Sequence, residues 1–216
     1  MFSAVPADTR LVLLLGHGAG GGVDAPDLEA LTRLSNRGVA VLRFEQPWRT
    51  AGKKVAPVPT QLDRGWRAAR AYVRTFLPDL PLVLGGRSAG ARVACRSAAT
   101  DPEGVLAVVA LSFPLHPPGK PESSRAPELL APDCPVLVVQ GERDPFGTPA
   151  EMAVTLRGVK NHTVVPVPGC RHEFRPAKRG PLDQAAVAEL LVSTVAEFLD
   201  QVHGRDITGE AAVDRE

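Results

Sequence analysis

The stretch PLVLGGRSAGARVA, from Pro81 to Ala94, decides how the rest of the chain is interpreted. A short apolar run leads into Gly85 and Gly86, Ser88 follows, and small residues continue from Gly90. The pattern Gly-x-Ser-x-Gly between a predicted strand and a predicted helix is typical of a sharp turn that exposes a serine hydroxyl. An ordinary glycine turn is the alternative. The remainder of the chain therefore has to decide whether Ser88 is structural or nucleophilic.

Apolar runs and amphipathic segments alternate on both sides of this stretch. Continuous apolar runs predict buried strands of a parallel sheet, and they cover residues 10–15, 39–44, 81–85, 105–111, 135–141 and 162–167. Apolar residues at helical spacing predict helices over residues 26–37, 62–76, 89–99, 149–157 and 187–202. Two proline-containing segments, 45–60 and 112–133, lack periodicity and are interpreted as loops. Pro166 places the last strand near an edge of the sheet.

Strands that alternate with helices predict right-handed crossovers and a parallel sheet covered on both faces. The expected architecture is a single α/β sandwich domain with about six mainly parallel strands. We expect this domain to span residues 1–203, and the polar residues 204–216 to form a flexible C-terminal tail.

The composition of the 216-residue chain is that of a globular protein, with 44% hydrophobic and 23% charged residues. A net charge of +1 gives no electrostatic reason to expect nucleic acid or a membrane surface as a partner. The start of the chain lacks the basic and apolar regions of a signal peptide, so we expect a cytoplasmic protein. Cys95, Cys134 and Cys170 are odd in number and far apart, which argues against a disulfide framework and a zinc site.

A serine becomes nucleophilic when a base takes its proton and an acid orients that base. In enzymes with this strand–turn–helix serine, the acid and then the histidine follow along the chain. Asp144, in QGERDPFG, follows the fifth predicted strand, and His172, in VPGCRHEF, follows the sixth. Parallel strands end at one edge of the sheet, so Ser88, Asp144 and His172 are expected to converge there. We therefore predict that these three residues form a catalytic triad.

Other residues compete for these roles. Glu142 also follows the fifth strand, but it comes only one residue after Gly141, so Asp144 is preferred. Glu173 could orient a histidine locally, and Asp144 could belong to a turn. Cys170 is interpreted as a packed thiol rather than as a second nucleophile. The remaining histidines have no matching partner and are interpreted as surface or structural residues: His116, His162 and His203.

The glycine-rich segment GHGAGG, residues 16–21, follows the first predicted strand. Acyl transfer needs two N–H donors aimed at the developing oxyanion, and we predict that the backbone N–H groups of Ala19 and Ala89 supply them. His17 is expected to hydrogen-bond the loop backbone rather than to react. A nucleotide-binding loop stays open as the alternative, since the glycines have dinucleotide-fingerprint spacing and Glu45 ends the second strand. The hydrolytic interpretation needs no cofactor and no metal.

These stretches resemble the α/β-hydrolase superfamily, and within it the dienelactone-hydrolase-like branch that contains testis-expressed proteins and the third subunit of the NSL chromatin complex. The resemblance rests on LLGHGAGG, VLRFEQPWRTAGKKVAP, GGRSAGAR, LSFPLHPPGKPE and VQGERDPFGT, within residues 11–175. FPLHPPGKPE is specific to the branch, whereas Gly-x-Ser-x-Gly is shared across the superfamily. The resemblance implies a Ser–Asp–His arrangement on Ser88, Asp144 and His172. Dienelactone hydrolases themselves carry cysteine at the position of Ser88, so dienelactone cleavage is not implied.

Relative to that superfamily, the chain is expected to lack the first two strands and a large cap domain, because only nine residues precede its first predicted strand. The two proline-containing segments are then expected to wall the substrate pocket. A small apolar cleft near Ser88 is predicted from six side chains: Phe44, Pro47, Trp48, Phe113, Leu115 and Phe146. Such a cleft suits an ester or thioester acyl group. These side chains could instead only pack the loops onto the sheet.

The leading functional prediction is a serine hydrolase that acts on a small ester, thioester or related acyl substrate. Ser88 attacks, His172 relays the proton, Asp144 orients His172, and water resolves the acyl-enzyme. An acyltransferase is one alternative, since sequence does not separate transfer to water from transfer to another acceptor. A binding or scaffold module with a vestigial site is the other, because the eukaryotic relatives are better known as components of complexes. The oligomeric state is left open.

Arg87 lies directly before the candidate nucleophile and is not used by this mechanism. The residue before the serine of this motif usually points away from the substrate. We therefore expect Arg87 to pair with a nearby carboxylate, Glu142 or Glu173, and to support the loops rather than to bind an acidic substrate.

Overall fold

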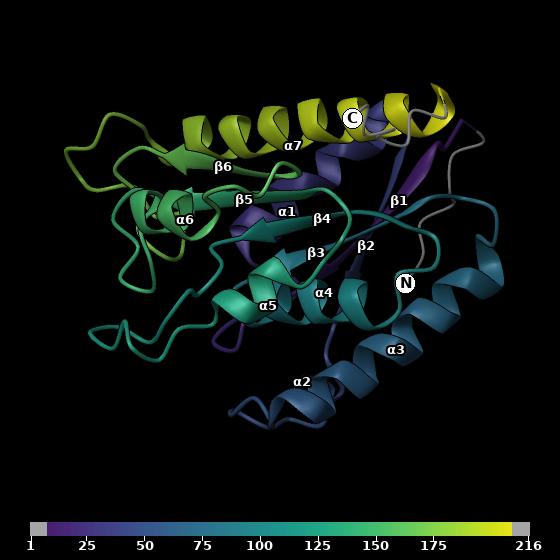
Figure 1. Ribbon diagram of the computed structural model, residues 1–216, viewed down its shortest axis with the longest axis horizontal. Coiled ribbons are helices and arrows are strands. Elements are labelled where there is room, and N and C mark those ends of the chain that lie inside the picture. Colours follow the sequence, from purple (N-terminus) through teal and green to yellow (C-terminus); the bar gives the residue numbers. More distant parts are fainter. Residues whose placement is uncertain (1–7, 209–216) are drawn as a thin grey trace.

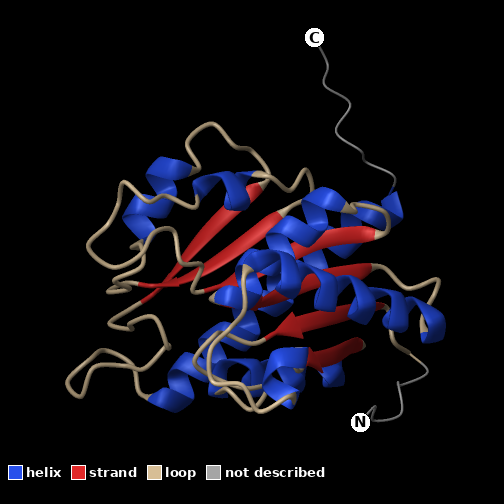
Figure 2. Cartoon of the chain, turned by 90° about the horizontal axis from the view of Figure 1, so that it is seen from below, coloured by secondary structure: helices blue, strands red, loops and turns tan. Residues whose placement is uncertain are grey.

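The structure is a computed structural model that describes residues 8–208. Its centre is a six-stranded sheet in the order β2-β1-β3-β4-β5-β6, in which every neighbouring pair is parallel. The strands are β1 (Leu11–Gly16), β2 (Val39–Phe44), β3 (Leu82–Arg87), β4 (Val105–Leu111), β5 (Val136–Gly141) and β6 (His162–Val167). Figure 2 shows the strands side by side with helices around them. The predicted single-domain α/β sandwich is confirmed, and its strand ends differ from the expected ones by at most one or two residues.

Seven α-helices and one 3₁₀ helix lie among residues 8–208 and connect or flank the strands. They are α1 (Pro26–Ala30), the 3₁₀ helix η1 (Leu31–Arg37), α2 (Pro47–Thr50), α3 (Pro59–Phe76), α4 (Ala89–Thr100), α5 (Ala126–Leu130), α6 (Pro149–Thr155) and α7 (Gln184–Thr208). The expected tail begins at Gly204, but α7 continues to Thr208. The rest of that tail, like the first seven residues of the expected domain, lies outside the described residues.

Both segments interpreted as loops contain a short helix, which corrects that prediction. In α2 and α5 a proline stands within the first turn, where its fixed φ suits a helix and its missing N–H is not needed. Each helix is anchored by one apolar side chain, Trp48 in α2 and Leu129 in α5, and both side chains are buried. Helices of four and five residues show no periodicity that a sequence pattern could detect.

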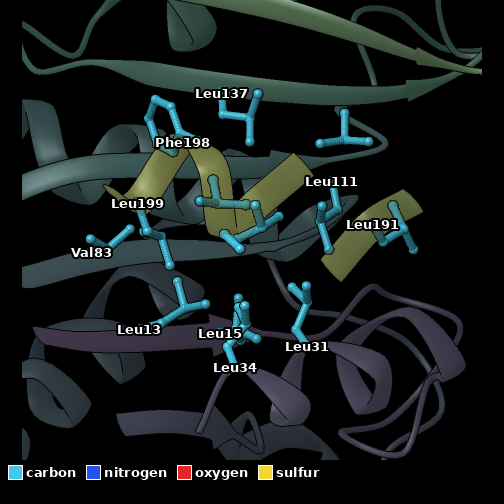
Figure 3. Packing of buried hydrophobic residues seen from close by; sticks show 14 of the residues in the cluster. Leu13, Leu15, Leu31, Leu34, Val83, Leu111, Leu137, Leu191, Phe198 and Leu199 are labelled. Carbon is cyan, nitrogen blue, oxygen red and sulfur yellow. The ribbon is translucent and has the colours of Figure 1, made fainter. Parts of the chain in front are cut away.

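Two hydrophobic layers cover the two faces of the sheet. Successive residues of a strand point to opposite faces, so Leu13 and Leu15 pack against α1, η1 and α7, whereas Val12 and Leu14 face the side of α3, α4, α5 and α6. Figure 1 shows α7 along one side of the sheet and α3, α4 and α5 on the other. Figure 3 shows the first layer, where leucines of β1 and η1 approach those of α7. No helix within residues 8–208 is long and apolar enough to span a membrane.

The carboxyl ends of all six strands lie on the same side of the sheet, across its width, because the strands are parallel. The chain passes from β1 outward to β2 and then returns to the other side of β1 with β3. Ligands of open α/β sheets bind at such a switch point, outside the carboxyl ends of the strands. The loops after β1 and β3 flank this switch point, and the loops after β5 and β6 follow along the same edge.

β6 is an edge strand, as Pro166 predicts. The backbone N–H of Glu142 donates to the carbonyl of Val167, so Val167 faces β5. Neighbouring residues of a strand present their backbone groups to opposite sides, and Pro166 therefore lies on the free edge of the sheet.

Candidate active site

Ser88 occupies the turn between β3 and α4. Its backbone lies at φ 53° and ψ −109°, in a region that residues other than glycine rarely adopt. Its N–H donates to the carbonyl of Leu111 at the end of β4, which ties the turn to the neighbouring strand. A strained residue held this way at the end of a strand is a frequent property of functional sites.

The glycines on either side of Ser88 are needed because the end of β1 crosses the turn at close range. A Cβ on Gly86 would lie 2.4 Å from the carbonyl oxygen of Gly16, and a Cβ on Gly90 would lie 2.2 Å from the same oxygen. Both distances are far shorter than any van der Waals contact. The Gly-x-Ser-x-Gly pattern therefore has a packing cause in this fold, in addition to the tightness of the turn.

Ser88, His172 and Asp144 come together in one hydrogen-bonded series. The Nδ1–H of His172 donates to Asp144 Oδ2 at 2.7 Å, and His172 Nε2 accepts from the Ser88 hydroxyl at 2.9 Å. The Asp144 side chain is completely buried, while that of His172 is 15% exposed. The tautomer is set by the carboxylate, which only accepts, so Nε2 is left free to take the serine proton.

The carboxylate of Asp144 is held by donors from its own loop and strand. The side-chain amide of Gln140 donates to Oδ2 at 2.8 Å, and the N–H of Phe146 donates to Oδ1 at 2.8 Å. The same Gln140 amide also donates to the carbonyl of Gly147. Gln140 is fully buried at the end of β5 and orients Asp144 as Asp144 orients His172. The aromatic ring of Phe146 packs on the His172 ring with centroids 4.2 Å apart.

The two expected oxyanion donors belong to segments next to Ser88: Ala89 follows it in sequence, and a Cβ on Gly18, the residue before Ala19, would lie 3.4 Å from the Cβ of Ser88. Ala89 opens α4 and Ala19 lies in the loop after β1, and within residues 8–208 neither N–H donates to a protein acceptor. His17 holds the second loop, since its Nδ1–H donates to the carbonyl of Gly18 at 2.8 Å and its Nε2 accepts from the N–H of Gln46. In a trans peptide the C=O and N–H point in opposite directions, so the Ala19 N–H points away from the His17 ring.

The residues expected to line the pocket are divided between two environments. Phe113, Leu115 and Trp48 are buried in the hydrophobic layer under the loops. Phe44 is half-buried and packs edge-on against Trp66 with ring centroids 6.2 Å apart, and Pro47 is exposed at the start of α2. Phe146 packs its ring on His172, a side chain of the predicted triad.

The competing residues take structural positions. Glu142 accepts from the N–H of Gly169, and Glu173 pairs with Arg175 at the surface. Cys170 is buried, and burial raises the pKa of its thiol, which disfavours a reactive thiolate. The side chain of His116 contacts Pro117 and Glu151, and that of His162 contacts Asn161 and Leu129. None of these groups reaches Ser88.

Arg87 pairs with Asp27, which corrects the expectation that its partner would be Glu142 or Glu173. Its Nε lies 3.5 Å from Asp27 Oδ2, and both side chains are largely buried. Asp27 is in the first turn of α1, and sixty residues separate the two in sequence. The partner could not be found from the sequence, because only the adjacency of β1 and β3 in the sheet brings α1 beside Arg87.

The glycine loop is not built like a dinucleotide site. In that fold the fingerprint glycines open directly into a helix whose N-terminus holds the pyrophosphate. Here α1 begins only at Pro26, five residues after Gly21, and it has five residues. The guanidinium of Arg87 lies against this loop, and Glu45 is exposed at the end of β2.

Sequence reasoning missed two residues of the site, Gln140 and Asp27. A glutamine at the end of an otherwise apolar strand, two residues before a turn, is the signal that could have identified Gln140. Asp27 looks like any acidic residue in the first turn of a helix, where it interacts favourably with the helix dipole.

Comparison with known proteins gives one family and many similar folds. Residues 9–200 match the model of a family described as an alpha/beta hydrolase domain. Est1E from Butyrivibrio proteoclasticus, solved with bound ferulic acid, is 18% identical with a TM-score of 0.73, and the match covers 93% of this chain and 94% of that one. An α/β serine hydrolase without lid from Xanthomonas campestris is 22% identical (TM-score 0.64; 89% and 85% covered). A serine hydrolase homologue from Coxiella burnetii is 17% identical (TM-score 0.67; 88% and 87%). At these identities the likeness concerns the fold.

Proposed function

The chain belongs to the alpha/beta hydrolase family, and from that premise we propose that it is a serine hydrolase that cleaves a small ester, thioester or related acyl compound. The observation that carries the proposal is the hydrogen-bonded series from Ser88 through His172 to Asp144. In this proposal Ser88 is the nucleophile, His172 the general base and acid, and Asp144 the residue that orients His172.

The proposed reaction has two halves. Ser88 Oγ attacks the acyl carbonyl carbon while His172 Nε2 takes the hydroxyl proton, and the buried Asp144 carboxylate stabilises the imidazolium that forms. The N–H groups of Ala19 and Ala89 donate to the oxyanion of the tetrahedral intermediate. His172 then gives its proton to the leaving oxygen or sulfur. Water, activated by the same histidine, hydrolyses the acyl-enzyme and regenerates Ser88.

The acyl group is proposed to be small and apolar. Phe146 supports this class, because its ring packs on His172 beside the nucleophile. The ferulic acid bound to Est1E makes aromatic acyl esters a sensible extension of the substrate series.

We further propose that the chain belongs to the dienelactone-hydrolase-like branch, on the basis of the FPLHPPGKPE stretch. We also propose that the enzyme is cytoplasmic and that neither nucleic acid nor a membrane is its partner. Cell fractionation beside a periplasmic marker checks the location.

Labelling with a fluorophosphonate probe tests the proposed function. The probe phosphonylates a serine only when a neighbouring base activates it, so wild-type protein is expected to gain one probe mass at Ser88. Ser88→Ala should abolish the labelling, whereas Ser193→Ala, which removes an exposed hydroxyl on α7, should label like wild type. Absence of labelling at Ser88 at neutral pH would contradict the proposal.

A p-nitrophenyl ester series of increasing acyl length, with a feruloyl ester added, then defines the substrate. Release of the free acid is expected, with the highest kcat/KM for a short acyl group. Formation of an acyl product on an added alcohol or amine in place of the free acid would instead identify an acyltransferase. If the probe labels the wild-type protein but cells that carry Ser88→Ala keep the wild-type phenotype, the protein is a scaffold whose site is not used.

A further inference from the structure

The Arg87–Asp27 pair is the charged feature closest to the candidate nucleophile that the reaction above does not use. Arg87 ends β3 directly before Ser88, and its side chain is 11% exposed. The Asp27 side chain is 3% exposed. Burial raises the pKa of the Asp27 carboxyl, and the nearby Arg87 charge opposes that effect. The pair therefore places a cation directly before the nucleophile in sequence, with a buried carboxyl beside that cation.

The guanidinium lies against the loop that carries Ala19. A Cβ placed on Gly18 would be 3.8 Å from Arg87 Nη1 and 3.4 Å from the Cβ of Ser88, and a Cβ on Gly21 would be 3.6 Å from Nη1. A methyl group at either position would therefore be in ordinary van der Waals contact with Arg87, which places the guanidinium beside the loop. Arg87 thus lies between the Gly18–Gly21 loop and Asp27 of α1, next to the part of the loop that approaches Ser88.

The loop is consequently supported from two sides. His17 holds the carbonyl of Gly18 on the side of Gln46, through the hydrogen bonds described above. Arg87 Nη1 lies beside the loop near Gly18 and Gly21, and Asp27 of α1 pairs with Arg87. The orientation of the Ala19 N–H depends on both supports, since the loop itself contains four small residues that impose little conformation of their own.

Stability does not account for the pair. Within the described residues, Arg87 Nε and Asp27 Oδ2 are buried without a hydrogen-bond partner, and their 3.5 Å contact is a charge contact only. Desolvation of two charges tends to cancel their attraction, and apolar replacements of such pairs are often neutral or stabilising. A pair of this kind beside a nucleophile is better explained by what it positions.

We propose that Arg87 and Asp27 are positioning residues that hold the Gly18–Gly21 loop where the Ala19 N–H meets the developing oxyanion; this inference rests on the proposed serine hydrolase function. The loop contact matters most in the tetrahedral transition state, because the oxyanion forms only there. Loss of the pair therefore lowers kcat and leaves KM almost unchanged.

Asp27→Asn is the first test, since it removes the charge that holds Arg87 and keeps the shape of the side chain. We expect kcat on a neutral p-nitrophenyl ester to fall about tenfold to hundredfold, less than or equal to the loss of one oxyanion donor, with KM within about twofold of wild type. Amide hydrogen exchange in the Gly18–Gly21 loop should become faster while the core strands keep their protection. Glu128→Gln is the matched control: it neutralises another arginine-paired carboxylate, on α5 at the opposite face, and should leave kcat and loop exchange unchanged.

The double variant Asp27→Leu/Arg87→Met guards against a folding artefact, because it leaves no unpaired buried charge. It should melt at or above the wild-type temperature and show the same loss of kcat. Wild-type kcat in the folded double variant would overturn the inference while leaving the proposed function intact. A raised KM confined to an ester with an acidic acyl group would also overturn it, since Arg87 would then bind substrate. If wild-type protein is neither labelled nor active, the proposed function fails first and this inference fails with it.

Discussion

Asp144 is the residue on which the chemistry of His172 depends. Oδ1 of its carboxylate accepts from the N–H of Phe146 and Oδ2 accepts from Gln140, which fixes the orientation of the carboxylate. Oδ2 also accepts from His172 and so sets the imidazole tautomer. Glu173 is the immediate neighbour of His172 in sequence, but its side chain is more than half exposed and pairs with Arg175. The position of an acid in space, and not its distance along the chain, decides which carboxylate serves.

Asp144→Asn should abolish most of the activity without unfolding the protein. The asparagine amide can turn its NH₂ group toward Nδ1 of His172 and so favour the wrong tautomer, and we expect kcat to fall about ten-thousandfold, as in other serine triads. Steady-state kinetics on a p-nitrophenyl ester measures the loss, and circular dichroism checks the fold. Glu173→Gln, one residue from His172, is the control and should keep wild-type kcat. A comparable loss in Glu173→Gln would mean that the acid has been misassigned.

At the scale of elements, the contact between the end of β1 and the start of α4 sets the geometry of the turn. Gly16 of β1 lies so close to Gly86 and Gly90 that neither can carry a side chain. The Gly-x-Ser-x-Gly pattern could be interpreted from the sequence because the strand before it and the helix after it could be predicted. Its dependence on β1 could not be predicted, since nothing in the sequence states that β1 and β3 are neighbours.

Gly90→Ala should therefore destabilise the fold and displace Ser88. The new methyl group would meet backbone of β1, which cannot move without breaking the sheet, so we expect a loss of about 1–3 kcal/mol or more in the free energy of unfolding. Urea denaturation measures it, and fluorophosphonate labelling should slow in parallel. Gly204→Ala in α7, where a Cβ would meet open space, is the matched control and should be neutral or up to about 1 kcal/mol more stable. Equal stability of the two variants would contradict the close contact.

Prediction of elements from the sequence succeeded where one signal dominated. The six strands are short, mainly apolar runs, and the apolar face of α7, marked by Val187, Leu191 and Val195, is buried as expected. The helices inside the proline-containing segments were missed because four or five residues carry too little pattern. The 26–37 segment changes to a 3₁₀ helix at Leu31, a difference in hydrogen bonding that side-chain spacing does not encode.

The site was predictable for the residues that lie on strand ends and unpredictable for those that lie behind them. Ser88, Asp144 and His172 follow strands whose shared parallel direction could be inferred, so their convergence at the carboxyl ends of the strands could be predicted. Asp27 and Gln140 act through other side chains. Their partners depend on how α1 and the end of β5 pack, and packing is not contained in local patterns.

At the scale of the whole molecule, one network of charges joins the helices on the second face of the sheet. Glu128 of α5 accepts from Arg92 and Arg96 of α4, and Arg96 also donates to Asp63 of α3. Burial alone would raise the pKa of the Glu128 carboxyl. The hydrogen bonds and charges of the two arginines outweigh burial, so this pKa lies below its ordinary value.

Stability should consequently depend on pH through Glu128. A carboxyl with a depressed pKa in the folded state contributes stability above its unfolded pKa, and that contribution is lost as the pH falls through the folded pKa. We expect the free energy of unfolding of Glu128→Gln at neutral pH to be lower than that of wild type by roughly 1.5–3 kcal/mol. When the pH is lowered from about 6 to about 3, we expect the free energy of unfolding to fall less in this variant than in wild type. Thermal unfolding of both proteins across that range is the measurement, and parallel curves for the two would contradict the assignment.

Pro166, on the outer side of β6, affects how the molecule behaves in concentrated solution. An open sheet has two edges, and an unprotected edge offers a ladder of N–H and C=O groups on which a second molecule could add a strand. Pro166 removes one N–H from the outward row, so a strand arriving from another copy would find that ladder interrupted. Growth of fibres from this side is thereby discouraged in concentrated solution. A residue without any part in the chemistry thus helps to keep the molecule dispersed.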